Sequence, residues 1–566
     1  MGTVSAGISE KQYAIFDDGP KKMQYLQVLL AFALLAVLPI VRAIRGKFAR
    51  RRALCNVRGP QSRSFATGNA VDLFNPSSLP LHRMNASLYG RIVKFNWIFG
   101  EPALFVADPK ALSHILIKDK ELYEECDVTG TRHLQYFMFG PGLLATIGHR
   151  HRRQRKMLNP VFSTAHIRSL TPLVQSLTFQ LRGILLKEVS GDKQEVELAE
   201  KLGHLAFELI AQAGFSRSYR ALEDGQSHSY VRALKELPPA ATKIGTMSLL
   251  AIALGIPNLP HGLLRFIGRL LPYRDLHYTM DLIQTLYSTA QGIFRDKKSV
   301  LGSVDSDKQD SEKRKDLITI LLENNSTASE EDRLADEEVV AQITSLMFAG
   351  TDTTSSAMTR VLYLLATHPD AQDRLREELI EAHWGELDYD RLMSLPYLDA
   401  ICRETLRLFT PVPYRTRRST TDIILPLQDP IIGVDGKEMR EILVPKDVNL
   451  FVDLNGVNTD PTIWGHDAFE WKPERWLSPL PSSVTDARIP SVYSHSATFL
   501  AGQKACLGFK FSELEMKAIL SILIPTFRLT PPDKEIVFRW GPIISPTVKG
   551  RETEPGSRLP MLLSKV

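Results

Sequence analysis

The sequence has few cysteines, and none of them is part of a closely spaced pair. Cys55, Cys126, Cys402 and Cys506 are the only four among 566 residues, and they lie far apart with no CxxC motif. Disulfide frameworks and structural zinc sites both need cysteines at short, regular spacings, so this pattern argues against both. A reducing compartment suits the cysteine content best.

The chain also has little net charge and no nucleotide-binding loop. Its formal charge is +5, and much of the basic excess lies in one stretch, Arg42 to Arg58. That is not the footprint of a nucleic-acid-binding surface, so no nucleic-acid partner is expected. No GxGxxG motif precedes a helix and no flavin-binding segment is found, so the chain has no dinucleotide domain of its own.

One uncharged run stands out near the N-terminus. Residues 23–41 carry no charge, and as a helix they would span roughly 28 Å, close to the thickness of the hydrocarbon layer of a membrane. Basic residues follow within 42–52, so the positive-inside rule places the rest of the chain in the cytosol. We expect a short lumenal segment over 1–22, a single transmembrane anchor over 23–41, and a basic linker or hinge over 42–69. The alternatives are a cleaved signal peptide, which the late start and the terminal arginines disfavour, and a buried core helix.

The remaining pattern is mainly helical. Residues 91–107 predict two strands about a turn at Gly100 to Pro102, and Pro109 suits the first position of a following helix. Acidic residues open a long helix at Asp336, in which apolar residues repeat at every third or fourth position. We therefore expect a mainly α fold with small β-sheets.

Cys506 stands in an unusual setting, between Gly502 and Gly508 and directly before a predicted helix. A lone cysteine among apolar residues is most often a small buried hydrophobe. The two glycines, however, allow a sharp turn and the close approach of a flat group. The unpaired N–H groups and the dipole of a helix start also favour the thiolate, which is the form that binds iron.

The run Phe499 to Gly508 resembles the FxxGxxxCxG haem-binding signature of the cytochrome P450 family. The resemblance implies haem b as the cofactor, with Cys506 as the thiolate ligand of the iron and with Phe499, Gly502, Lys504 and Gly508 around the haem. Lys504 stands where the family most often has arginine. It keeps the charge that would face a haem propionate but lacks the bidentate fork of arginine.

A second motif, Ala349 to Thr354 (AGTDTT), lies in the middle of the long helix. Its small and polar residues could form a helix–helix contact, but an acid beside two threonines in an otherwise apolar helix favours a helix that is locally opened and lines a polar pocket. The motif resembles the oxygen-activation motif of the family. The resemblance implies that Gly350 makes room for dioxygen, that Thr353 offers it a hydrogen bond, and that Asp352 helps deliver protons from solvent.

A third motif pairs Glu404 with Arg407, and Arg475 follows in the run PERW. Most glutamate–arginine pairs at this spacing are surface ion pairs worth about 0–1 kcal/mol. Here the helix is largely apolar, and the two segments resemble the ExxR and PERF motifs of the family. The resemblance implies that Glu404, Arg407 and Arg475 form a buried structural triad behind the haem.

Further basic groups match haem-propionate positions of the family. Arg155 corresponds to the arginine of the WxxxR motif, and His151 replaces the tryptophan of that motif. Arg417 or Arg418 follows the third motif at the usual distance, and we favour Arg417. A solvated basic patch is the alternative for these groups.

The motifs together imply that residues 70–566 form a haem-containing catalytic domain with the cytochrome P450 fold. The reaction would insert one oxygen atom from O2 into a lipophilic small molecule. Electrons would come from a separate NADPH-dependent cytochrome P450 reductase, with cytochrome b5 as a candidate second donor. The expected location is the endoplasmic reticulum membrane, with the catalytic domain in the cytosol. The sequence resembles fungal members that oxidise terpenoids and other secondary metabolites.

Two other functions remain open. A family member that rearranges a peroxide needs neither dioxygen nor a reductase, and a membrane-bound haem sensor or carrier performs no oxidation. Asp352 with Thr353 disfavours both, because neither function needs proton delivery.

Overall fold

The structure is a computed structural model, and it describes residues 45–126, 133–189, 191–223, 229–244, 261–303 and 316–566. The expected lumenal segment over 1–22 and the expected anchor over 23–41 lie outside these ranges. Among the helices that the structure does describe, none has the length and apolar content needed to span a bilayer.

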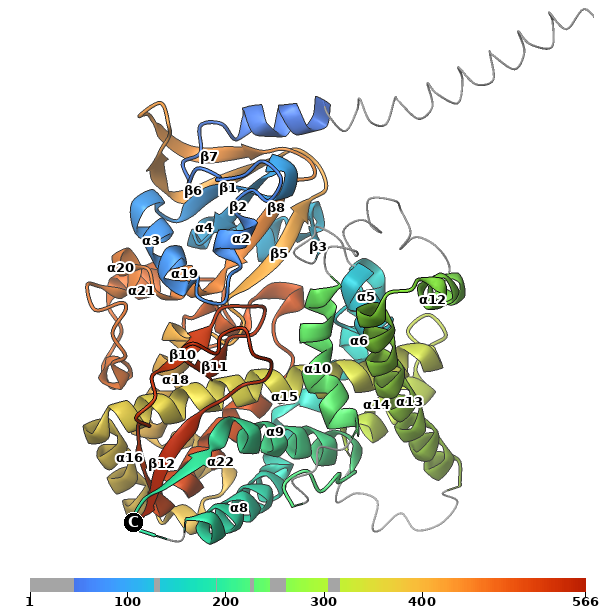
Figure 1. Ribbon diagram of the computed structural model, residues 1–566, viewed down its shortest axis with the longest axis vertical. Coiled ribbons are helices and arrows are strands. Elements are labelled where there is room, and N and C mark those ends of the chain that lie inside the picture. The colour runs from blue at the N-terminus through green and yellow to red at the C-terminus, as the bar shows by residue number, and fades with distance from the viewer. Residues whose placement is uncertain (1–44, 127–132, 190, 224–228, 245–260, 304–315) are drawn as a thin grey trace, which may run out of the picture.

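Helices form most of the described chain, below a smaller region built from strands (Figure 1). The longest helix, α15, crosses the helical region and packs against α9, α18 and α22. The helices are α2 (Ala70–Leu73), α3 (Leu79–Tyr89), α4 (Pro109–Ser113), α5 (His133–Phe139), α6 (Gly148–Leu158), α7 (Thr164–Ser169), α8 (Thr171–Glu188), α9 (Leu198–Phe215), α10 (Ser229–Lys243), α12 (His261–Leu270), α13 (Arg274–Ser303), α14 (Leu317–Thr327), α15 (Asp336–Thr367), α16 (Pro369–Glu381), α17 (Tyr389–Ser394), α18 (Pro396–Leu408), α19 (Leu454–Asn458), α20 (Pro461–Trp464), α21 (Ser482–Ala487) and α22 (Phe509–Thr526).

The long central helix begins where the sequence predicts. α15 starts at Asp336 with acidic residues throughout its first turn, which suit the positive end of the helix dipole. Its repeating apolar positions, such as Val339, Ile343 and Met347, are fully buried. The expected local opening at 349–354 is not observed, because the helix runs through these residues without a break.

The strands form small sheets, so the predicted mainly α fold with small β-sheets is confirmed. The largest sheet has the strand order β1-β2-β8-β5-β3, and the pair β1 and β2 is the hairpin predicted over 91–107. Pro109 opens α4, as predicted, and the preceding Asp108 carboxylate accepts from the Ala111 N–H at 2.9 Å. The strands are β1 (Ile92–Asn96), β2 (Pro102–Val106), β3 (Tyr123–Glu125), β4 (Gln194–Glu197), β5 (Tyr414–Ser419), β6 (Ile423–Ile432), β7 (Glu438–Val444), β8 (Asn449–Asp453), β9 (Phe527–Thr530), β10 (Ile536–Arg539), β11 (Ser545–Val548) and β12 (Pro560–Lys565).

The segment expected to be a hinge packs onto the sheet region. Residues 45–53 are helical, and Arg50 donates to the Glu101 carboxylate at 3.0 Å. Leu54 and Val57 are buried in a core that they share with β2 and β8. The described part of the expected 42–69 linker, from residue 45 onward, is therefore attached to the body by ion pairs and apolar burial.

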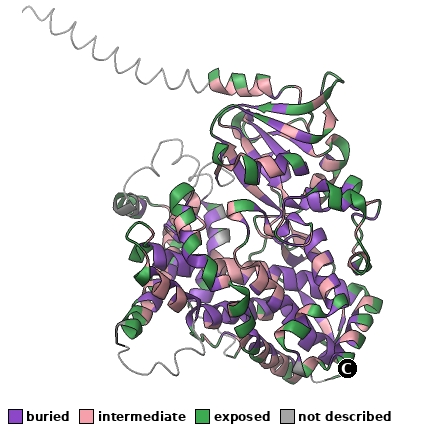
Figure 2. Cartoon of the chain, turned by 180° about the vertical axis from the view of Figure 1, so that it is seen from behind, coloured by how far each residue is buried: buried purple, intermediate pink, exposed green. Residues whose placement is uncertain are grey.

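The buried residues form one large cluster in the helical region and smaller ones in the sheet region. Figure 2 shows buried residues at the centre of the helical region, with exposed residues along its outer helices. α15 and α22 meet in the large cluster. The second motif of the sequence lies on α15, and Cys506 comes just before α22, so one motif lies on and the other next to helices that pack against each other.

Candidate active site

A short loop holds Cys506 just before α22. The Cys506 N–H donates to the Phe499 carbonyl at 2.8 Å, which closes the loop on itself. Gly502 has a φ of +71°, and a Cβ there would lie 2.2 Å from the Leu116 carbonyl oxygen. Only glycine fits both conditions. At Gly508 a Cβ would meet nothing closer than Phe162, at 3.6 Å, so packing against the described protein does not explain that glycine.

The Cys506 thiol lies deep in the protein and still keeps an accessible surface. Burial is the largest influence and raises its pKa, while the Gly508 N–H and the positive charges of Arg155 and Arg415 lower it. No group of three His, Cys, Asp or Glu side chains that could hold a metal ion occurs within the described ranges.

The basic helix α6 presents two faces to the protein. On one face, Arg150 and Arg153 each contact the Glu338 carboxylate at 2.6 Å. On the other face, Arg155 donates to the Ala505 carbonyl at 2.7 Å, next to Cys506. The basic run of α6 is thus divided between the start of α15 and the cysteine loop, and the alternative of a solvated basic patch does not fit Arg155.

A cluster of charges lies beside the cysteine loop. Lys504 Nζ contacts the Glu125 carboxylate at 2.7 Å and donates to the Thr146 carbonyl at 2.8 Å. Arg415 and Arg417, from β5, also contact Glu125, at 2.8 and 3.5 Å. Two of the positive charges expected at the haem propionates, Lys504 and Arg417, therefore gather around one carboxylate together with Arg415. We call Glu125, Lys504, Arg415 and Arg417 the Glu125 cluster.

His151 lies against the Glu125 cluster and is buried. Burial first, and then the positive charge of Lys504, lowers the pKa of His151 to about 3, so the imidazole is neutral at physiological pH. Arg418 points elsewhere and pairs with Asp447 at 3.1 Å. Of the two candidates on β5, Arg417 is thus the one that the structure brings to the site.

The second motif combines helix packing with a buried acid. A Cβ at Gly350 would lie 3.1 Å from Ile210 of α9, so this glycine allows the close contact of α9 with α15. The Thr353 hydroxyl donates to the Ala349 carbonyl at 2.7 Å. Burial raises the pKa of Asp352 to about 6, and the positive charge of Lys235 on α10 opposes that rise. The motif therefore has a packing residue and an acid that titrates near neutral pH.

A buried glutamate links the helices of the two motifs. Glu515 of α22 accepts from the Thr354 hydroxyl of α15 at 3.0 Å, and its other oxygen is buried without a hydrogen bond. Burial raises the pKa of Glu515 to about 8, so the side chain is a neutral acid at pH 7.

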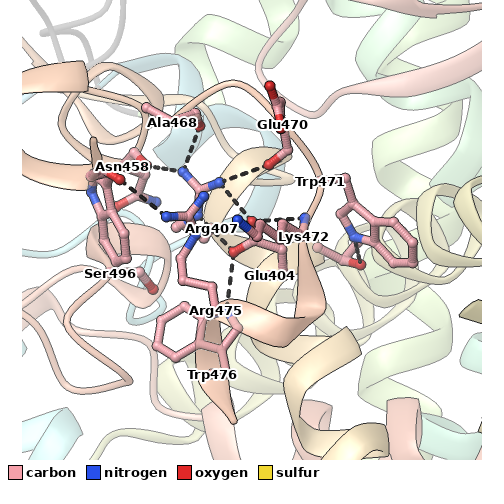
Figure 3. Close-up of polar contacts among 12 residues, drawn as sticks. Glu404, Arg407, Asn458, Ala468, Glu470, Trp471, Lys472, Arg475, Trp476 and Ser496 are labelled. Atoms are coloured by element: carbon pink, nitrogen blue, oxygen red, sulfur yellow. Dashed lines mark hydrogen bonds and ion pairs between the residues drawn. The ribbon is translucent and has the colours of Figure 1, made fainter. Parts of the chain in front are cut away.

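The third motif forms a buried charge network (Figure 3). Arg407 is fully buried and makes two parallel bonds of 2.8 Å to the Glu404 carboxylate. It also donates to the carbonyls of Asn458 and Ala468, at 2.8 Å each, and to that of Glu470 at 3.3 Å. The carbonyl contacts reach from α18 to the last residue of α19 and to the segment that follows it.

Glu404 is satisfied from the same segment. Its oxygens accept from the Lys472 N–H at 3.1 Å, from the Trp476 indole at 2.9 Å and from Arg475 at 3.4 Å. Arg475 in turn donates to the carbonyls of Trp464 and Asp467. The three predicted residues thus lie together, each with several partners, as a buried ion pair requires to be stable.

Four residues of the site were not predicted from the sequence. They are Glu125, Arg415, Lys235 and Glu515. A signal existed for Glu515, because it falls in line with Phe511, Ala518 and Ile522 on the apolar face of its helix. Arg415 shares the strand alternation of Arg417. No sequence signal connects Glu125 or Lys235 to the site.

Comparison with known proteins identifies the family. The family model of cytochrome P450 matches residues 59–543. Cytochrome P450 monooxygenases 81 and 91 of Postia placenta are 41% and 40% identical, over 509 and 547 residues, which cover 89% and 96% of this chain and 92% and 99% of those proteins. Ganoderic acid synthetase CYP5150L8 of Ganoderma lucidum is 37% identical over 517 residues, which cover 90% of this chain and 94% of that protein.

The chain belongs to the cytochrome P450 family. It is an oxidoreductase that incorporates oxygen, and its family cofactor is a haem whose iron is ligated by a cysteine thiolate. Members of the family act on lipophilic substrates with O2 and a redox partner. The predicted family, class of enzyme and cofactor are thereby confirmed.

Proposed function

We propose that this protein is a haem-thiolate monooxygenase of fungal secondary metabolism in which Cys506 ligates the iron. The observation that carries the proposal is the position of Cys506, which is accessible, lies before α22 and receives the Gly508 N–H. Cys126 and Cys402 are buried, and burial raises the pKa of Cys402 well above its usual value. Cys55 lies in the segment before β1, and the cytochrome P450 match begins after it, at residue 59. Cys506 therefore suits a thiolate ligand best.

The residues around the loop fit a haem. When bound, the haem supplies the redox centre at which O2 is activated. Arg155, Arg417 and Lys504 would face its negative propionates, and the neutral imidazole of His151 would offer a hydrogen bond beside them. Gly508 would leave the flat ring free to approach the loop, since no described contact otherwise requires glycine there. Phe499 and Gly502 would shape the loop, and the triad of Glu404, Arg407 and Arg475 would fix the core behind it.

Asp352 suits a proton-delivery role. Its pKa of about 6 means that the carboxyl gains and loses a proton readily near neutral pH. The positive charge of Lys235 limits the rise and keeps a usable fraction ionised. Thr353 lies one residue further along α15, and its hydroxyl oxygen can accept a hydrogen bond while it donates to Ala349. We assign Asp352 to proton supply, Thr353 to holding the reacting oxygen and Gly350 to making room for dioxygen.

We propose a lipophilic, terpenoid-like substrate from secondary metabolism. One relative is named a ganoderic acid synthetase and comes from a fungus, as do the monooxygenases of Postia placenta. The chain has no dinucleotide domain, so we propose an NADPH-dependent cytochrome P450 reductase as electron donor, with cytochrome b5 as a candidate second donor. We also propose that residues 23–41 anchor the protein in the endoplasmic reticulum membrane, with the catalytic domain in the cytosol.

The carbon monoxide spectrum of the reduced protein tests the ligand. We expect the long-wavelength band of the family in the wild-type protein and in the matched control Cys402→Ala, and loss of that band in Cys506→Ala. Retention of the band in Cys506→Ala would show that the ligand is wrong. Turnover with microsomal reductase and NADPH should give an oxygenated product. A product formed from a hydroperoxide alone would favour the peroxide-rearranging alternative, and no product from any screened terpenoid would favour the sensor.

A further inference from the structure

Glu125 is the acid at the centre of the Glu125 cluster. It is the last residue of β3 and is 7% exposed. Its carboxylate contacts three cations, Lys504 at 2.7 Å, Arg415 at 2.8 Å and Arg417 at 3.5 Å. One nearly buried carboxylate therefore forms ion pairs with three positive side chains from two separate parts of the chain.

The strand register explains how two of these cations reach Glu125. β3 pairs antiparallel with β5, and Glu125 lies directly opposite Arg417. Alternation along β5 puts Arg415 on the same face as Arg417, within reach of the same carboxylate. Lys504 reaches Glu125 from the cysteine loop, and its ammonium group also donates to the Thr146 carbonyl. Glu125 thus joins the edge of the sheet to the loop that carries Cys506.

The charges of the Glu125 cluster do not balance among themselves. Three cations and one carboxylate leave two net positive charges in a largely buried place. Haem b carries two propionates, so a bound haem would bring two negative charges, which would balance the two net positive charges of the Glu125 cluster. The three cations hold the pKa of Glu125 far below its usual value, against the opposing effect of burial, so the carboxylate stays ionised at any pH that the enzyme meets.

Glu125 matters for the direction of the positive charge at position 504, because the residue there is a lysine and not an arginine. An arginine fork fixes its own direction through two parallel bonds, whereas an ammonium group is a point charge on a flexible stem. Here the Glu125 carboxylate and the Thr146 carbonyl hold that ammonium group from two sides. A lysine at this position is therefore directed by its partners, and Glu125 is its charged one.

We infer that Glu125 is a positioning residue, which holds Lys504 and Arg417 in place while no haem is bound and sets the net charge that their site offers to the haem propionates. This inference rests on the propionate-facing roles proposed above for Lys504 and Arg417. Without Glu125 the same site holds three uncompensated cations. The haem-free protein then suffers most from their mutual repulsion, and the two propionates relieve it.

The test compares Glu125→Gln with Glu338→Gln in the full chain. Glu338 is a matched control because it is buried and binds two arginines of α6 on the face away from Cys506. For Glu125→Gln we expect the melting temperature to fall more without haem than with haem. Haem should also bind more tightly, with a dissociation constant at least about tenfold lower, since largely buried charges interact strongly. The reduction potential of the iron should become more positive, because a nearby negative charge is lost. Glu338→Gln should lower both melting temperatures alike and leave the potential unchanged.

Two further variants separate charge from geometry. Glu125→Asp keeps the charge, so the potential should return to the wild-type value. The double variant Glu125→Gln with Lys504→Met restores two net positive charges, so it should recover most of the stability without haem even if Glu125→Gln alone does not fold.

Equal losses of stability in the two forms of Glu125→Gln, together with an unchanged potential, would reduce Glu125 to a packing residue and overturn the inference. Weaker haem binding in that variant would overturn it as well. Failure of the wild-type protein to take up haem, in contrast, would count against the proposed function and not against the role of Glu125.

Discussion

Replacing Glu515 with glutamine tests whether a neutral acid lies between α15 and α22. The folded protein raises the pKa of Glu515 to about 8, from an ordinary 4.5. Below pH 4.5 the carboxyl is protonated in the folded and the unfolded chain, and it costs nothing. As the pH rises from 4.5 to 8, only the unfolded chain loses the proton, so folding becomes less favourable. Above about pH 8 the full loss is reached.

The size of this effect follows from the shift. Each unit of pKa difference corresponds to about 1.4 kcal/mol, so the acid costs roughly 3 kcal/mol at pH 7 and about 5 kcal/mol above pH 8. Glutamine has nearly the same shape, carries no charge at any pH and can still accept from the Thr354 hydroxyl. The variant Glu515→Gln should therefore be more stable than the wild-type protein by about these amounts, with a difference under about 1 kcal/mol at pH 5.

Urea unfolding of the haem-loaded protein, followed by tryptophan fluorescence at several pH values between 5 and 9, measures the difference. Glu404→Gln is the matched control, because Glu404 is equally buried but paired with two arginines, and its replacement should destabilise the protein at every pH. A stability difference between Glu515→Gln and wild type that does not grow with pH would refute the assignment of a neutral acid.

Three further substitutions test the packing and the charges of the site. Arg407→Lys should cost about 1–3 kcal/mol, because an ammonium group cannot reproduce the fork to Glu404 and leaves buried backbone carbonyls without their donors; an unchanged urea midpoint would contradict this. Asp352→Asn should stabilise the protein by about 3 kcal/mol at pH 8 and hardly at pH 4, because a carboxyl whose pKa is raised from 3.8 to about 6 makes folding less favourable as the pH rises between those values. Product formation should fall in the same variant. Equal stability of variant and wild type at pH 8, or full turnover, would argue against the buried-acid role. Gly350→Ala should cost about 1–3 kcal/mol through its contact with Ile210, measured as a lower melting temperature that Ile210→Ala partly recovers, and an unchanged melting temperature would rule out the close contact.

Local sequence patterns predicted the parts of the fold that local physics controls. The acidic start and apolar repeat of α15 specify a helix that begins at Asp336. The β1–β2 hairpin and the proline at the start of α4 follow from turn and capping preferences. The chemistry of the cysteine loop could also be predicted, because glycines, a thiol and a helix start lie within ten residues of one another.

Other features of the site could not be predicted, because they depend on contacts between distant parts of the chain. The sequence allowed two interpretations of Gly350, and only the position of Ile210 on α9 shows that the glycine serves helix packing. Glu125 looks like an ordinary strand residue until the sheet register places it opposite Arg417. The family motif singled out Arg155 in the basic run of α6, but nothing in the run showed that Arg150 and Arg153 turn to Glu338, since that depends on where the partner segment lies.

The triad of Glu404, Arg407 and Arg475 has a consequence for how the chain is made. Every partner of Arg407 other than Glu404 comes later in the chain than α18. The partners of Glu404 other than Arg407 lie in the segment that ends at Trp476. During synthesis α18 leaves the ribosome with Arg407 able to pair only with Glu404 of the same helix, so the carbonyl partners that Arg407 needs in order to be buried are missing until that later segment follows. The core of the helical region is therefore completed late, shortly before Cys506 itself is added. A chain that stops between Arg407 and Trp476 would keep an apolar, charged helix exposed, which is the kind of surface that chaperones and proteases act on.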